Sequence, residues 1–130
     1  MSDAAEKQPE QYISEQQHKD NLVSQLSTSP EIVEQLRGYG INEDRKCKLE
    51  YFFYTNAAEK AGSLSTELTD MGYDATFDDS VPGKKIKIVA GATVPVLMAT
   101  EKVLEWTESM CNIGYKHDCE FDGWGLNPEQ

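Results

Sequence analysis

The clearest pattern in the chain is the alternation of apolar and polar residues over positions 46–54. A period of two predicts a strand with one buried face, and the aromatic residues at its end are typical of strands. The same alternation predicts three further strands, over residues 73–78, 85–90 and 115–122. The central and C-terminal parts of the chain are therefore expected to contain four strands.

Apolar residues spaced three and four positions apart predict two helices between these strands. Residues 57–71 carry one such stripe, and Gly72 follows it as a stop signal. A longer stripe begins after Thr93 and Pro95 and is expected to end at Gly114. Each predicted helix thus has a stop signal at its end, which supports the division into elements.

The first 40 residues have a weaker pattern. Residues 1–10 lack apolar periodicity and are expected to be disordered. Residues 11–26 carry a diluted helical stripe, and Ser29-Pro30-Glu31 is typical of a new helix start, because hydroxyl caps and proline favour the first turn. We therefore expect two short helices that form an N-terminal arm over residues 11–40.

The order strand, helix, strand, strand, helix, strand restricts the fold. With right-handed crossovers, the simplest solution is a four-stranded antiparallel sheet with both helices on one face. This is the ferredoxin-like βαββαβ architecture of the α+β class, with strand order 4-1-3-2. We expect this domain over residues 41–126 and a tail over residues 127–130.

Charge pairing predicts a register for the first and last strands. If Lys48 faces Asp118, three outer-face pairs are opposite in sign, and each such pair contributes about 0.2–1 kcal/mol. The same register sets Cys47 opposite Cys119 on the inner face. We therefore expect the two cysteines to lie close together.

The net charge of −11 excludes some functions and favours others. It arises from 23 acidic against 12 basic residues. Such a surface repels phosphate backbones, which makes direct nucleic-acid binding unfavourable. The alternatives are a partner with a basic surface and a charge that serves solubility alone.

Hydropathy gives an expectation about location. The sequence has no apolar run near the roughly 20 residues that a membrane helix needs. Its N-terminus lacks the basic and then apolar pattern of a secretion signal. We therefore expect a cytoplasmic protein that does not associate with membranes.

Motifs for catalysis are missing from the sequence. It contains neither a glycine-rich phosphate loop nor a G-x-S-x-G elbow. His117 and Cys119 share one face of the predicted strand, but no third group orients them as a nucleophile and base. Asp118, Glu120 and Asp122 alternate on the outer face of the same strand, where no pocket would shift a pKa. We therefore expect no enzymatic activity and no cofactor.

A ligand site is the alternative that remains open. In the predicted register Cys47, His117 and Cys119 converge, with Cys111 on the adjacent helix, and four such ligands suit zinc. Against this, the spacing of these residues matches no zinc motif, and small apolar residues normally pack at such positions. The alternative is a small-molecule- or metal-binding domain.

Aromatic residues indicate a possible binding surface. Phe52 and Tyr54 would emerge on the sheet face opposite the helices, unless the N-terminal arm covers them, which is the arrangement we favour. RNA-recognition domains stack bases on such a face, but this strand lacks their motif. Trp124, between Gly123 and Gly125, is either a lid on the core or a recognition tip.

The C-terminal segment Cys119-Glu120-Phe121-Asp122-Gly123-Trp124-Gly125 resembles the E-[YF]-D-G-W-G ending of the RraB family, protein regulators of ribonuclease E. The segment 49–54, with Ala57-Ala58 and the helix that ends at Met71-Gly72-Tyr73, is also similar to that family. The resemblance covers residues 38–126. It implies a ferredoxin-like fold and a non-catalytic role, in which members inhibit ribonuclease E by binding its non-catalytic region and remodelling the RNA-degrading assembly.

Charge and resemblance together predict an acidic regulatory protein that binds a basic partner, with ribonuclease E or a related RNA-degrading assembly as the expected partner. An acidic protein that docks on a basic scaffold is physically consistent with the net charge. The residues expected to contact the partner are Asp118, Glu120, Asp122, Trp124, Phe52 and Tyr54.

Overall fold

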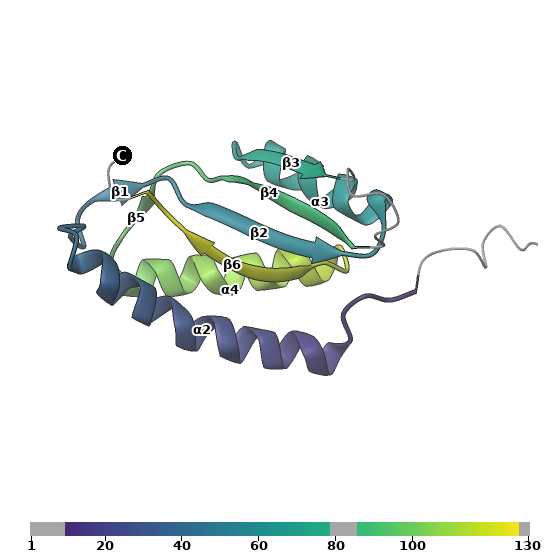
Figure 1. Cartoon of the computed structure of the whole chain (residues 1–130), viewed down its shortest axis with the longest axis horizontal. Coiled ribbons are helices and arrows are strands. Elements are labelled where there is room, and N and C mark those ends of the chain that lie inside the picture. Colours follow the sequence, from purple (N-terminus) through teal and green to yellow (C-terminus); the bar gives the residue numbers. More distant parts are fainter. Residues whose placement is uncertain (1–9, 79–85, 128–130) are drawn as a thin grey trace, which may run out of the picture.

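The computed structural model describes residues 10–78 and 86–127, and within these ranges it contains three helices and six strands (Figure 1). The connection between the second and third predicted strands, most of the predicted disordered N-terminus and the end of the tail lie outside the described residues. In chain order the elements are α2 (Glu15–Arg37), β1 (Lys46–Cys47), β2 (Glu50–Thr55), α3 (Ala58–Asp70), β3 (Asp74–Asp78), β4 (Lys87–Ala92), β5 (Val96–Leu97), α4 (Thr100–Lys116) and β6 (Glu120–Gly125).

Helix α2 is one continuous helix of 23 residues, so the prediction of two short helices is wrong. A capping box closes its first turn: Ser14 Oγ accepts from the Gln17 N–H, and the Gln17 side chain accepts from the Ser14 N–H. Pro30 lies inside the helix, although proline removes a backbone donor there. The helix continues past Pro30 because the face that carries Val33 and Leu36 is buried in the core.

Ser29, predicted to cap a helix, lies within α2 and is almost fully buried. The Thr107 hydroxyl donates to the Val103 carbonyl at 2.8 Å. Because this uses the one hydroxyl hydrogen of Thr107, Ser29 Oγ donates to Thr107 Oγ1, 2.8 Å away. Trp124 Nε1 in turn donates to Ser29 Oγ at 2.8 Å. We call this directed chain of hydrogen bonds, which connects β6, α2 and α4, the polar relay.

The strands form two antiparallel sheets, so the prediction of one sheet is wrong. The larger sheet has the order β3-β4-β2-β6, and the smaller pairs β1 with β5. Counted as the four predicted strands, the order of the larger sheet reads 4-1-3-2 from β6. The predicted strand over residues 46–54 divides at Leu49, because its N–H donates to the Thr93 hydroxyl and its carbonyl accepts from the Thr93 N–H.

Strand β6 begins later than predicted, because α4 continues to Lys116. Gly114 does not end this helix. It lies inside α4, where a Cβ would stand 2.8 Å from the Cys119 carbonyl oxygen and 2.9 Å from the Phe53 ring. The glycine therefore allows the last turns of α4 to approach the sheet closely.

The observed register replaces the predicted one. Phe53 pairs with Phe121, and Tyr54 pairs with Glu120, with an irregularity between Phe52 and Phe53. The predicted partner of Lys48, Asp118, lies before β6, in the connection from α4. The prediction that Lys48 faces Asp118 is therefore wrong. The prediction fails because residues 115–119, which it places in an extended strand, belong to the end of α4 and the connection that follows it.

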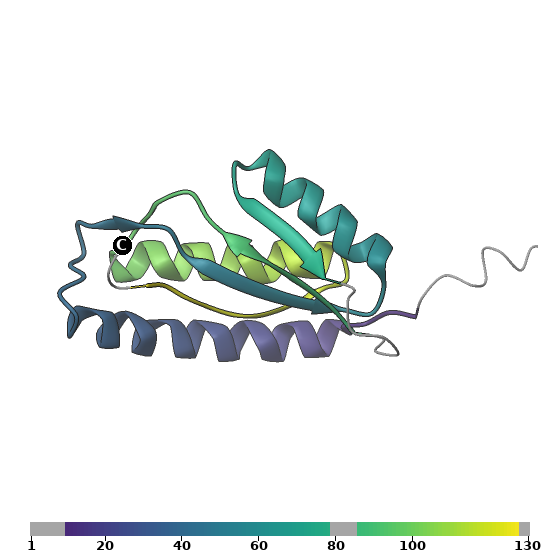
Figure 2. The same cartoon turned by 45° about the horizontal axis from the view of Figure 1, so that its top comes forward.

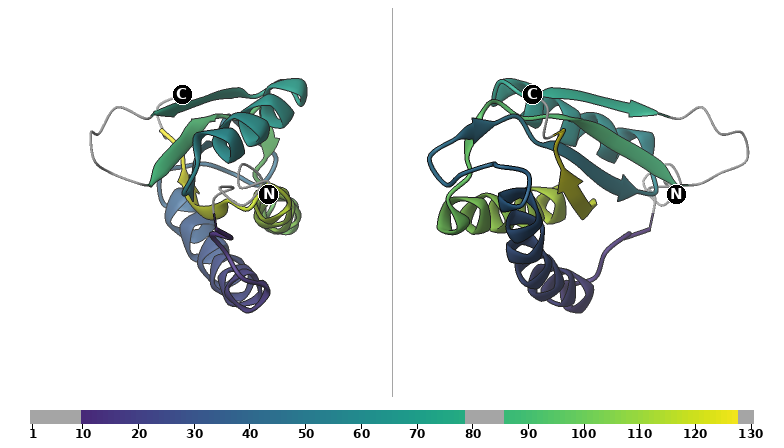
Figure 3. Two further views of the ribbon diagram at one scale, coloured as in Figure 1. Left: turned by 90° about the vertical axis from the view of Figure 1, so that its right-hand side faces the viewer. Right: turned by 60° about the vertical axis from the view of Figure 1, so that its left-hand side comes forward.

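The core lies between the inner face of the larger sheet and helices α3 and α4, and α2 adds Val33 and Leu36 to it. Tyr51 and Phe53 of β2 are fully buried there, together with Leu64 of α3 and Val103 of α4. Helix α2 packs against α4 and β6 rather than across the outer face of the sheet (Figure 3). The expected cover over Phe52 is therefore not provided by α2, and 41% of this residue is exposed.

Candidate partner-binding surface

Strand β2 contributes to the outer face of the larger sheet, because its side chains alternate between exposed and buried positions. Glu50 and Phe52 are exposed and Tyr54 is half-buried, whereas the intervening Tyr51 and Phe53 are buried. Alternate side chains of a strand point to opposite faces, so one strand supplies both the core and this surface. An acid and two aromatic rings therefore stand in a row on the outer face.

Small residues in β4 create a shallow depression beside this row. Phe52 pairs with Ala90, and Glu50 pairs with Ala92, which pairs on its other side with Asp74. The short side chains leave a hollow of about 470 Å³ with a carboxylate on two sides. We call it the acidic hollow, and its lining is Glu50, Phe52, Asp74, Ala75, Thr76, Ala90, Gly91 and Ala92.

A second acidic group lies at the β6 side of the same face. Burial and then the charge of Asp122 raise the pKa of Glu120. The charge of Asp122 is also the main cause of the raised pKa of Tyr54, followed by burial and a hydrogen bond to Asp122. Burial, then Glu120 and Asp122, raise the pKa of Tyr12. In all three cases the charge of a neighbouring carboxylate contributes to the raised pKa, so a cation near these residues would be favourable.

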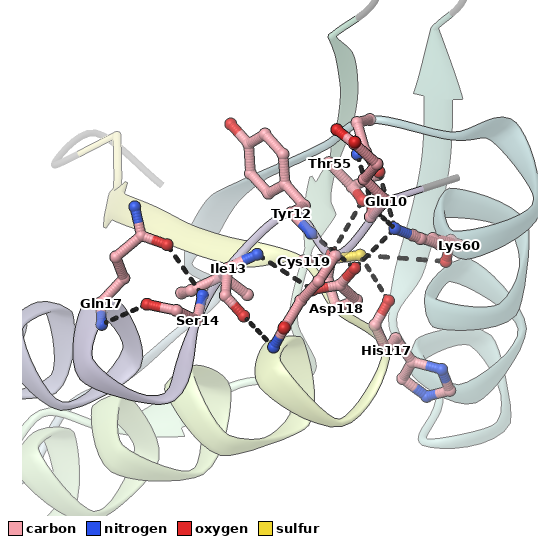
Figure 4. A network of polar contacts seen from close by, with 12 residues as sticks. Glu10, Tyr12, Ile13, Ser14, Gln17, Thr55, Lys60, His117, Asp118 and Cys119 are labelled. Atoms are coloured by element: carbon pink, nitrogen blue, oxygen red, sulfur yellow. Dashed lines mark hydrogen bonds and ion pairs between the residues drawn. The ribbon is translucent and has the colours of Figure 1, made fainter. Parts of the chain in front are cut away.

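Asp118 lies near these residues, but its carboxylate is occupied (Figure 4). It accepts hydrogen bonds from the Tyr12 N–H at 2.7 Å, the Ile13 N–H at 3.0 Å and Lys60 Nζ at 2.5 Å. Burial opposes ionisation, but the bonds from Ile13, Lys60 and Tyr12 outweigh it and lower the pKa of Asp118. We call these contacts the Asp118 clasp. Asp118 was expected to contact a partner, whereas here it attaches the segment before α2 to the connection between α4 and β6 and, through Lys60, to α3.

Trp124 is also held inside the molecule. It is 7% exposed, and its ring stacks edge to face on Trp106 with ring centroids 5.8 Å apart. Its indole N–H is used by the polar relay. Of the two interpretations of this residue, the structure favours a lid on the core over a recognition tip.

The residues of the alternative ligand site do not converge as predicted. Cys47 pairs with Val96 in the smaller sheet, while Cys119 lies just before β6. His117 Nε2 lies 2.7 Å from the Glu67 carboxylate. Burial raises the pKa of the Cys119 thiol to about 11, so this buried thiol is neutral at pH 7. Within residues 10–78 and 86–127, no group of three or more His, Cys, Asp and Glu side chains is placed to hold a metal ion.

The surface therefore keeps four of the six predicted residues and gains others. Glu50 and Asp74 were not predicted as contacts, although the alternation in their strands places both on the polar face. Tyr12 lies beside this surface without being counted in it, and its position could not have been found from the sequence because it depends on the contact between residues 12 and 118. We call the revised set the outer-face surface: Glu50, Phe52, Tyr54, Asp74, Glu120 and Asp122.

These features define the molecule as a small α+β protein whose larger sheet has an acidic and aromatic outer face. The family model for RraB, regulator of ribonuclease activity B, matches residues 27–126, and the chain belongs to this family. The family is one of regulators of ribonuclease activity, and membership supports a regulatory role for this protein. No curated protein matches the chain significantly. In the part of the chain that the structure describes, the helices lack the combination of length and apolarity needed to cross a membrane.

Proposed function

We propose that this protein binds ribonuclease E, or a related RNA-degrading assembly, in the cytoplasm and changes its activity without making or breaking bonds. Family membership supports regulation of a ribonuclease. The observation that carries the proposal is the outer-face surface, where four carboxylates share a sheet face with the exposed Phe52 and the half-buried Tyr54. A ribonuclease or its scaffold must attract RNA phosphates, so its surface offers the matching positive charge.

The chemistry of this surface favours arginine and lysine over other partner residues. A guanidinium can bond a carboxylate and stack on an aromatic face at the same time. In the acidic hollow, Glu50 and Asp74 lie on two sides of an apolar floor with Phe52 beside it. At the β6 side, Glu120 and Asp122 provide a second attachment point. Binding here would compete with RNA for the same cationic residues of the partner.

The test combines binding and activity with purified ribonuclease E. Affinity is measured by calorimetry at low and high salt, and the initial rate of cleavage of a fluorescent RNA is followed in parallel. A variant that neutralises four outer-face acids should bind about tenfold more weakly or worse, and should lose its effect on cleavage. The substitutions are Glu50→Gln, Asp74→Asn, Glu120→Gln and Asp122→Asn.

A matched control separates the surface from net charge. Four exposed acids on α2 and α4, away from the sheet face, are neutralised in a second variant with the same total charge. It should bind and regulate like the wild type. Equal losses in the two variants, or no binding by the wild type at either salt concentration, would contradict the proposal. The control substitutions are Glu31→Gln, Glu34→Gln, Glu101→Gln and Glu108→Gln.

A further inference from the structure

The two edges of the larger sheet have different surroundings. At the β6 edge, α2 lies alongside the strand. Asn21 Nδ2 donates to the Phe121 carbonyl at 2.9 Å, and Gln25 Nε2 donates to the same oxygen at 3.3 Å. Two side chains of α2 thus already donate to the Phe121 carbonyl oxygen, a backbone acceptor that an added strand would need. The β6 edge is therefore blocked from within the chain.

Strand β3 forms the opposite edge. It pairs with β4 on one side, and among residues 10–78 and 86–127 no strand pairs with its other side. In Figure 2 it runs along the margin of the sheet, next to α3. In an edge strand, alternate N–H and C=O groups point away from the one partner strand. The β3 edge therefore has the backbone groups that an added strand would use.

Hollows of different chemistry flank this edge on the two faces of the sheet. On the outer face, Asp74 and Thr76 line the acidic hollow. On the inner face, Phe77 is 39% exposed and borders a groove of about 340 Å³ along α3. The residues that line this groove are Gly62, Ser65, Thr66, Thr69, Asp70 and Phe77. We call it the α3 groove.

We propose that an extended segment of a partner protein, with alternating cationic and apolar side chains, pairs with β3 as a fifth strand. Its cationic side chains would lie on the outer face of the sheet, next to Asp74, and would reach the acidic hollow. Its apolar side chains would turn to the other face and pack on Phe77 in the α3 groove. Backbone pairing supplies affinity in this mode, and the alternating pockets supply selectivity. The inference rests on the proposed function and specifies how its partner binds.

Charge selects this occupant over two others. A second copy of the chain also carries a charge of −11 and would bring a second Asp74 to the interface, which is repulsive. A nucleic-acid strand would place phosphates beside Glu50 and Asp74. A cationic peptide strand neutralises the negative potential and also forms hydrogen bonds with the backbone groups at the β3 edge.

The test uses a labelled peptide of four Arg-Val repeats, capped at both ends, with binding followed by fluorescence anisotropy. Two further peptides carry backbone N-methyl groups on all arginines or on all valines. Methylation removes N–H donors from one edge of an extended peptide and keeps its charge. One methylated peptide should bind about tenfold more weakly or worse, while the other keeps the affinity of the parent. Equal affinity of all three, or equal loss in both, would overturn strand pairing.

Measurements on the protein locate the peptide. Backbone amides in β3 should exchange more slowly with solvent when the parent peptide is bound, whereas those of β6 should not change. Asp74→Asn should weaken binding several-fold, and Asp70→Asn, on the rim of the α3 groove, should weaken it less. Slower exchange in β6 alone, or a larger effect of Asp70→Asn, would overturn the proposed placement.

The outcome is separable from that of the proposed function. If the outer-face variant loses ribonuclease E but methylation has no edge-specific effect, strand addition is wrong and the proposed function stands. If the peptide pairs with β3 but ribonuclease E does not bind, the proposed partner is wrong and the edge site stands. A concentration-dependent dimer that protects the β3 amides without peptide would assign the edge to a second copy and overturn the inference.

Discussion

Asp118 and Glu120 are two residues apart in the sequence, yet the pKa values of their carboxyl groups are shifted in opposite directions. Asp118 receives two backbone N–H groups and Lys60, and its pKa is lowered. The pKa of Glu120 is raised, first by burial and then by Asp122. One carboxylate is stabilised by donors from its own chain, whereas the other is more stable once a cation approaches from outside.

This difference shows how to separate structural from functional acids in a protein that has many of both. The sequence pattern placed Asp118, Glu120 and Asp122 together as equivalent outer-face charges. The hydrogen bonds divide them, because a carboxylate that already accepts several bonds has little to offer a partner. The acids that remain exposed or electrostatically unfavourable are the better candidates for binding.

The largest effect is expected for Asp118→Asn. Asparagine tolerates the positive φ of 59° at this position, so the substitution removes the charge with little added backbone strain. Because the side chain is 23% exposed and its bonds are charge-assisted, the free energy of unfolding should fall by about 2 kcal/mol. Urea denaturation measures this. An unchanged midpoint would remove the Asp118 clasp as a stabilising feature.

The free energy of unfolding should depend on pH in opposite directions through Asp118 and through Glu120. The lowered pKa of Asp118 contributes stability that is fully present above its ordinary value of 3.8 and is lost as pH falls through the folded pKa. The stability difference between the wild type and Asp118→Asn should therefore be constant at neutral pH and shrink below about pH 4. Denaturation curves recorded from pH 7 to pH 3 test this, and a difference independent of pH would contradict it.

A smaller effect is expected for Lys60→Met, which keeps the aliphatic stem and removes the cation of the clasp. The Lys60 side chain is 17% exposed, and its loss should cost about 1 kcal/mol in unfolding free energy. Lys116→Met is the control, because that side chain is 63% exposed in its pair with Glu67 and should contribute almost nothing. Similar losses in the two variants would mean that the clasp has no special strength.

The smallest effect is expected for Glu120→Gln, and its sign should be reversed. The raised pKa of Glu120 means that stability is fully present below its ordinary value of 4.5 and is lost as pH rises through the folded pKa. Neutralising the side chain should leave stability within about 0.5 kcal/mol of the wild type at pH 7, on the side of an increase. A clear loss at pH 7 would show that Glu120 has an internal donor and is structural.

Local patterns predicted most of the architecture. The alternation around Tyr51 and Phe53 predicted which face of β2 is buried, and the stripe that includes Leu64 and Leu68 predicted the inner side of α3. These predictions succeeded because burial of a regular element imposes its own period on the sequence. The family resemblance, based on the segment 119–125, is confirmed by the family model.

Long-range contacts account for what the sequence did not predict. Pro30 was interpreted as a helix start, but tertiary packing carries α2 through it. Residues 115–119 alternate like a strand, although 115 and 116 are helical and Asp118 adopts a left-handed conformation. The roles of Asp118 and Trp124 depend on partners about a hundred residues away in the chain, Ile13 and Ser29. No local period records such contacts.

The polar relay determines how α2 can leave the rest of the protein. If α2 slid along α4 by one turn, Ser29 would move away from both Thr107 and Trp124, and the indole N–H would be left without an acceptor in an apolar interior. The helix therefore has one favourable docked position and no neighbouring ones. Its release should be an all-or-none event, in which amides along the whole of α2 become accessible to exchange together.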